Sequence, residues 1–165
     1  MTELYIGVGV VAVTLFVLFL SRLSVYRGKM PYRHRHILTK PEYAFWNVLR
    51  TKVAKYDLLI CPKVRMEDFL SVSAKTDRQR QAWRGKIKSR HIDFILCDKD
   101  MRMLAGIELD DASHGTKEAM RLDRFKNQVF ETIGLPLFRV IVRNGDYSAQ
   151  IDGILRALHL SGKDE

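Results

Sequence analysis

Cysteines and known nucleic-acid-binding motifs are scarce or absent in this chain of 165 residues, and each absence excludes a class of structure or function. It has only two cysteines, Cys61 and Cys97, each inside an apolar run where a reduced thiol acts as a small hydrophobic side chain. No helix-turn-helix, zinc-finger or RNA-binding motif is visible, and neither is an internal repeat. Any sequence-specific recognition of nucleic acid would therefore have to come from loops.

Charge is absent from residues 4–20, where only Tyr5 and Thr14 are polar. Seventeen such residues are at the short end of a membrane-spanning helix, so we expect a transmembrane anchor over residues 4–21. A cleaved signal peptide is the alternative. It requires a basic segment before the apolar run and small residues at a cleavage site, and here the only preceding charge is Glu3.

Positive charge is concentrated after this run. The chain has 28 Lys and Arg against 19 Asp and Glu, a net charge of +9, and residues 22–37 form a basic juxtamembrane linker. The positive-inside rule then predicts a cytoplasmic C-terminal domain and an N-terminus outside. That compartment is reducing, which argues against a disulfide. A basic surface favours anionic partners, either nucleic acid or the anionic inner leaflet.

The rest of the chain predicts one α/β domain with a mixed sheet over residues 38–160. The spacing Thr39-Lys40-Pro41-Glu42 is that of a helix start with a capping box. Apolar periodicity and turn residues predict a helix over 39–54, strands over 56–64, 91–96 and 103–109, a helix over 116–133, a strand over 137–142 and a helix over 148–160. Residues 66–72 fit a short helix or a strand equally well.

Acidic residues stand where packing does not require them. In the strand ending at Glu108-Leu109-Asp110, alternation places Glu108 and Asp110 on one face, and Asp93 lies within the preceding strand. A hard divalent cation suits such acids, since Mg²⁺ is held by one or two carboxylates together with water and phosphate oxygens. Without a cation, the gathered acids would raise one another's pKa, and removing one would relieve repulsion.

Five short segments, in the same order, resemble the PD-(D/E)XK nuclease superfamily. The likeness is to its branch containing the very-short-patch repair endonucleases, and in particular to an uncharacterised bacterial family with an N-terminal membrane anchor. It covers roughly residues 37–145. The matching segments are Thr39–Glu42, Arg90–Asp98, Ile107–His114, Asp123–Lys126 and Gly134–Leu137.

The resemblance implies a restriction-endonuclease-like αβββαβ core and Mg²⁺- or Mn²⁺-dependent cleavage of DNA at the bacterial inner membrane. Asp93, Glu108 and Asp110 would be metal ligands, together with the carbonyl of Leu109. One departure matters, because Asp110 occupies the superfamily's usual lysine position. The resemblance therefore makes His114 the candidate general acid or base.

Two further residues enter through the same resemblance. Lys126, on the helix after the third strand, would supply the missing positive charge. Glu42 matches an auxiliary acid of many members, although its place in the capping box explains it completely.

The basic run of residues 75–90 is the candidate nucleic-acid-binding segment. Arg84, Lys86, Lys88 and Arg90 surround Trp83 at a spacing that suits phosphate contacts. The same run is also compatible with a solvated loop or with contact to anionic lipid.

The site candidates also have purely structural interpretations. Asp93 could cap a turn or pair with Arg90, and His114 could be a helix N-cap. Glu108 and Asp110 could form salt bridges with Arg124 and Lys126 on the following helix, where charges are ordinary. Two other functions therefore stay open: a catalytically inactive nuclease fold that binds nucleic acid or a protein, and a membrane scaffold.

Overall fold

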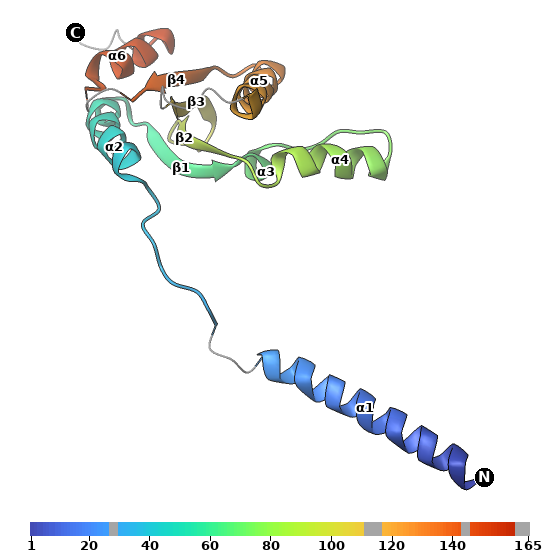
Figure 1. Cartoon of the computed structure of the whole chain (residues 1–165). Helices are drawn as coiled ribbons and strands as arrows, with labels where there is room; N and C mark the ends of the chain where they lie inside the picture. Colours follow the sequence, from blue (N-terminus) through green and yellow to red (C-terminus); the bar gives the residue numbers. More distant parts are fainter. Residues whose placement is uncertain (27–29, 111–116, 143–145, 161–165) are drawn as a thin grey trace. The chain divides into compact units, whose positions relative to one another are not determined.

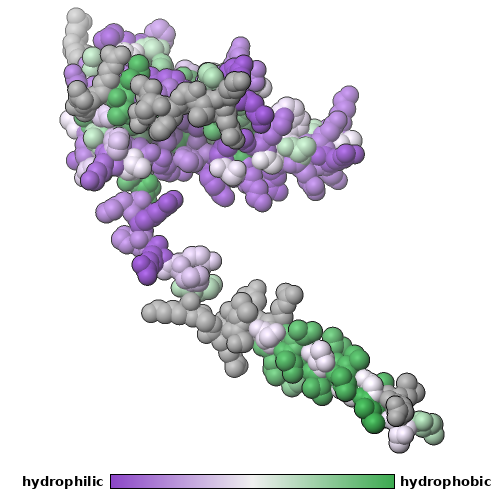
Figure 2. Space-filling model, in the orientation of Figure 1, coloured by the Kyte–Doolittle hydropathy of each residue, from purple (hydrophilic) through white to green (hydrophobic). Residues whose placement is uncertain are grey.

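The computed structural model describes residues 1–26, 30–110, 117–142 and 146–160, and the chain divides into two compact units, Met1–Arg35 and His36–Glu165 (Figure 1). The N-terminal unit contains the helix α1, Thr2–Tyr26, which extends into the predicted linker. Its large apolar side chains from Tyr5 to Leu20 are exposed and form the green surface in Figure 2. Within the described part of the chain, no helix is long and apolar enough to cross a membrane.

The C-terminal unit is built on a four-stranded mixed sheet with the strand order β1-β2-β3-β4. The first three strands pair antiparallel, while β3 and β4 are parallel and are joined through α5. The elements are α2 (Lys40–Val53), η1 (Ala54–Tyr56), β1 (Leu59–Arg65), α3 (Met66–Phe69), α4 (Asp77–Ile87), β2 (His91–Cys97), β3 (Met103–Asp110), α5 (Lys117–Thr132), β4 (Leu137–Ile141) and α6 (Ser148–Ala157). The predicted mixed α/β class and each predicted element of this unit are confirmed.

Two apolar cores cover the two faces of this sheet because side chains alternate along its strands. Phe94 and Leu96 of β2 pack with α2 and α6 on one face. Ile95 and Cys97 pack on the other face with residues of α3, α4 and α5. Gly106 of β3 lies directly under Phe130 of α5, where a Cβ atom would stand only 2.6 Å from the ring. The face of β3 that carries Gly106 also carries Glu108 and Asp110.

The basic run forms a helix that was not predicted. Between residues 75 and 90, α4 begins after Thr76, whose side-chain oxygen accepts the backbone N–H of Gln79 at 3.3 Å. Only its last residue, Ile87, is buried. Figure 1 shows α4 extending away from the sheet beside α5.

Candidate functional site

Asp93 is fixed at the point where β2 and β3 separate. Registered pairing of these strands ends at Phe94 opposite Ile107. Beyond it, the backbone N–H of Leu109 donates to Asp93 Oδ2 at 3.0 Å. The side chain of Asp93 is only 13 % exposed. The carboxylate therefore replaces a bond of the strand ladder and is held rigidly at this end of the sheet.

Lys63 of β1 stands opposite Asp93, between the registered pairs Pro62–Phe94 and Val64–Ile92. Its Nζ lies 2.9 Å from Asp93 Oδ1 and 2.5 Å from Glu42 Oε1. Burial lowers the pKa of Lys63, but the bonds to Glu42 and Asp93 outweigh burial and leave that pKa raised. Lys63 is also a left-handed residue with φ 54°, a backbone conformation that costs energy for a non-glycine residue.

Glu42 combines two roles. It lies in the first turn of α2, and its Oε2 accepts the backbone N–H of Thr39 at 2.8 Å, which is its half of the predicted capping box. Its Oε1 accepts from Lys63, and the residue is 9 % exposed. The start of α2 is therefore tied to the edge strand through one carboxylate.

Glu108 and Lys126 form a buried ion pair between β3 and α5. Lys126 Nζ is 2.7 Å from each carboxylate oxygen of Glu108, and the two side chains are 10 % and 8 % exposed. Burial raises the pKa of Glu108, Lys126 lowers it, Asp93 raises it further, and the pKa stays above its usual value. Because Phe94 stands opposite Ile107 on antiparallel strands, Asp93 and Glu108 come next to each other, so this pair and the Asp93–Lys63 pair form one ionic cluster.

His91 completes the cluster. Its Nε2 is 3.5 Å from Lys63 Nζ and 3.9 Å from Asp93 Oδ1, and its side chain is half-exposed. Burial lowers the pKa of His91, and Lys63 lowers it further. The imidazole is therefore neutral at neutral pH and can accept a proton.

Residues 34–158 match the model of a family described as "Protein of unknown function (DUF2726)". The chain belongs to this family. No curated protein and no solved structure matches it. The matched segment includes every element from α2 to α6, so the whole cluster lies within the DUF2726 domain.

Asp110 does not join the other two predicted metal ligands. Its carboxylate pairs with Arg139 of β4 at 3.0 Å, and Arg139 also pairs with Asp123 of α5 at 2.9 Å. Burial lowers the pKa of Arg139, but these two bonds outweigh burial and leave that pKa raised. In the DUF2726 domain Asp110 thus ties β3 to β4 and α5, although through Arg139 rather than through the expected Arg124 or Lys126.

Three further expectations concern the metal ion, Leu109 and His114. Across the residues that the structure describes, no group of three or more His, Cys, Asp or Glu side chains is arranged to hold a metal ion. Leu109 contributes its backbone N–H to Asp93. His114 lies outside the described residues.

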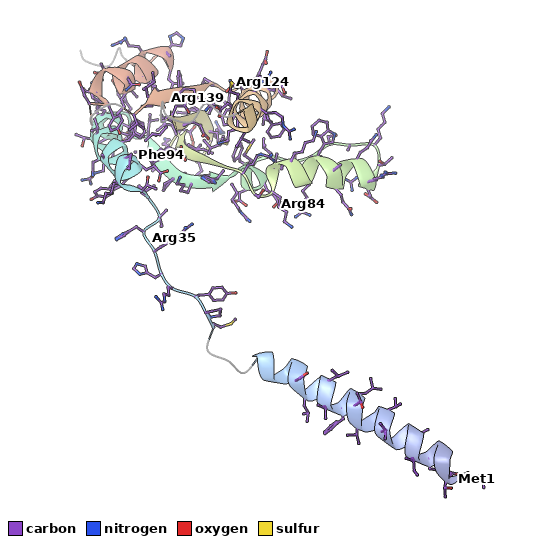
Figure 3. The ribbon with its side chains drawn as sticks, viewed as in Figure 1. Met1, Arg35, Arg84, Phe94, Arg124 and Arg139 are labelled. Carbon is purple, nitrogen blue, oxygen red and sulfur yellow. The ribbon has the colours of Figure 1, made fainter. Side chains whose placement is uncertain are left out.

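The predicted nucleic-acid-binding residues lie on α4 and just after it. Arg84 pairs with Glu67 of α3, and Figure 3 shows Arg84 on α4. Arg90 donates to the backbone carbonyl of Lys86. Arg90 is therefore not the partner of Asp93, which instead pairs with Lys63.

The sequence analysis gave no functional role to Lys63 or His91. The signal that could have identified these two residues is the pairing register of β1 and β2. If Cys61 stands opposite Ile95, then Lys63 stands opposite Asp93, and His91 follows on the same face of β2. That register becomes known only once β1 and β2 are seen to pair.

Proposed function

We propose that the DUF2726 domain is a metal-dependent phosphodiesterase that cleaves DNA on a restriction-endonuclease-like fold. The observation that carries the proposal is the position of Asp93 and Glu108 on adjacent strands, at the point where the strands separate, with a lysine held against each carboxylate. The order of α2, β1, β2, β3, α5 and β4 agrees with the αβββαβ core of such nucleases.

The donor set fits a hard cation. Asp93 and Glu108 supply the carboxylates that Mg²⁺ or Mn²⁺ prefers, with water and phosphate oxygens filling the other positions. The bound ion would polarise the phosphate and lower the pKa of a bound water. We assign the metal to these two residues, and we assign Asp110 a positioning role through Arg139.

The remaining groups of the cluster suit phosphate chemistry. Lys63 and Lys126 place two ammonium groups where negative charge would develop on a phosphate, which replaces the lysine missing from position 110. Neutral His91 is a half-exposed proton acceptor beside them. We therefore assign an acid–base role to His91, and the role expected for His114 stays a prediction.

A second function has an observation of its own. Because a lysine already neutralises each carboxylate, the same contacts would stabilise an inactive fold that only binds nucleic acid or a protein. In that case the ion pairs serve packing alone.

Cleavage separates the two functions. Purified protein is incubated with plasmid, single-stranded DNA and RNA in the presence of Mn²⁺ or Mg²⁺. We expect DNA cleavage by the wild type and by Asp68→Asn, a control acid in an exposed pair with Arg65. We expect none from Asp93→Asn or Glu108→Gln. Binding without cleavage by the wild type would favour the inactive module.

We also propose that the chain is held at the bacterial inner membrane, with the DUF2726 domain in the cytoplasm. The support is the uncharged run of residues 4–20 and the basic segment that follows it. In the structure, the exposed apolar surface of α1 has the composition of a segment covered by lipid or protein. The full chain should sediment with membranes, whereas a chain that stays in the supernatant would contradict the proposal.

A further inference from the structure

A basic groove lies between α4 and α5. Its volume is about 440 Å³, and its described lining contains four cationic residues and no Asp or Glu. Lys86 and Arg90 lie on the α4 side, and Arg121 and Arg124 belong to α5, where Figure 3 labels Arg124. Four positive charges facing one groove create a strong local positive potential, which favours a chain of phosphates.

A mainly apolar cavity continues from this groove, and its lining also contains one acid, Glu131. Its volume is about 570 Å³, and it shares Phe125 and Gln128 with the basic groove. Trp83 and Ile87 of α4 line it from one side and Val129 of α5 from the other. Trp83 is 50 % exposed, so a large part of its ring remains accessible to a ligand.

Aromatic rings hold the cations at the boundary between the two cavities. Lys86 Nζ lies 3.8 Å from the centre of the Trp83 ring, and the Arg90 guanidinium lies 5.3 Å from that of Phe125. Such cation–π contacts restrict two long side chains before any ligand arrives. The surface thus presents fixed positive charge directly beside apolar and aromatic area.

We propose that this combined surface binds single-stranded nucleic acid, with the phosphates along the basic groove and a base in the apolar cavity against Trp83. Proteins that bind single strands combine a positive groove with aromatic rings on which bases stack. A duplex offers its phosphates, but the faces of its bases are already stacked on each other. An anionic membrane offers phosphates and no base.

The groove also lies next to the candidate active site along the chain. Arg90 precedes His91, and Phe125 precedes Lys126, so the groove and the ionic cluster share the start of β2 and the middle of α5. The proposal names the form of the substrate for the proposed nuclease, and in that sense it rests on the proposed function.

Binding is tested without divalent metal, so that a failure to cleave does not affect the result. Fluorescence anisotropy of labelled oligo(dT) and of a duplex is measured in EDTA with the full chain. Stacking of one base is worth about 1–3 kcal/mol, so Trp83→Ala should weaken oligo(dT) binding about 10-fold and leave duplex binding unchanged. Trp83→Phe, which keeps a ring, should retain most of the affinity and also guards against a folding defect.

Charge is tested in parallel. Arg121→Gln with Arg124→Gln should weaken oligo(dT) binding and reduce its salt slope by about 0.7 for each phosphate that the protein no longer neutralises. The control pair, Lys99→Gln with Arg102→Gln, removes the same charge at exposed positions outside the lining and should bind nearly as the wild type does.

Three results would overturn the proposal. The first is an oligo(dT) affinity that Trp83→Ala does not change. The second is an equal loss of affinity for oligo(dT) and duplex, which would leave a phosphate site without a base pocket. The third is binding only to vesicles containing anionic lipid, which would make α4 a membrane contact.

Discussion

Glu108 and Lys126 form a buried ion pair, so each side chain compensates the charge of the other. The sequence alone shows several acids and predicts that removing one relieves repulsion. The structure pairs Asp93 with Lys63 and Glu108 with Lys126. Removing one partner of a buried pair leaves an uncompensated charge, so we expect loss of stability instead.

The pH dependence of Lys126→Met tests this pair. The variant should lose about 3 kcal/mol of unfolding free energy at neutral pH. A carboxyl whose pKa is raised in the folded state contributes stability at low pH and loses it as pH rises through that pKa. Lys126 lowers the pKa of Glu108, so removing it raises that pKa further. The deficit relative to wild type should therefore be larger at about pH 8 than at about pH 5.

Urea unfolding at the two pH values gives the measurement. Lys52→Met is the matched control, because it breaks a pair with Asp152 whose side chains are 25 % and 42 % exposed. It should cost at most about 1 kcal/mol. An equal deficit for Lys126→Met at both pH values would show that the charge of Glu108 is not what the lysine compensates.

At the scale of elements, the strands and most helices were predictable because their apolar residues repeat with the right period. The exception is α4, whose only apolar residues besides alanine are Trp83 and Ile87, too few to show a helical period. The cations that pair with Glu108 and Asp110 could not be predicted from the sequence either. Alternation correctly places Glu108 and Asp110 on one face of β3, but which cation meets each depends on the packing of α5 and β4.

The contact between β3 and α5 gives an element-scale prediction. A Cβ at Gly106 would lie 2.6 Å from the Phe130 ring and 2.8 Å from a Leu137 methyl group, so Gly106→Ala must displace α5. We expect a loss of about 2 kcal/mol, typical of overpacking. Gly153→Ala is the control, because no atom lies within 4 Å of its added methyl group apart from its chain neighbours and the backbone of its own helix, and alanine favours this helix by about 1 kcal/mol. Thermal unfolding of both variants measures the loss. A Gly106→Ala protein as stable as the wild type would contradict this packing.

At the scale of the whole molecule, the sequence predicts a basic, mixed α/β domain following an apolar segment, and the C-terminal unit agrees with the first part. What composition cannot predict is a site assembled across α2, β1, β2, β3 and α5. Glu42 and Glu108 are far apart in sequence, and Lys63 links the first of them to Asp93 only through the pairing of β1 with β2. Such a site depends on tertiary structure.

Metal binding should stabilise the whole C-terminal unit if Asp93 and Glu108 hold a cation. A ligand that binds only the folded state, at 100 times its dissociation constant, adds about 2.7 kcal/mol to the unfolding free energy. Thermal unfolding of wild type in Mn²⁺ should therefore shift upward, and Asp68→Asn should shift equally. Asp93→Asn should begin lower without metal, because Lys63 keeps only Glu42 as its paired carboxylate, and it should not respond to Mn²⁺. A wild-type protein that never responds, or an Asp93→Asn protein that responds fully, would show that these acids serve packing alone.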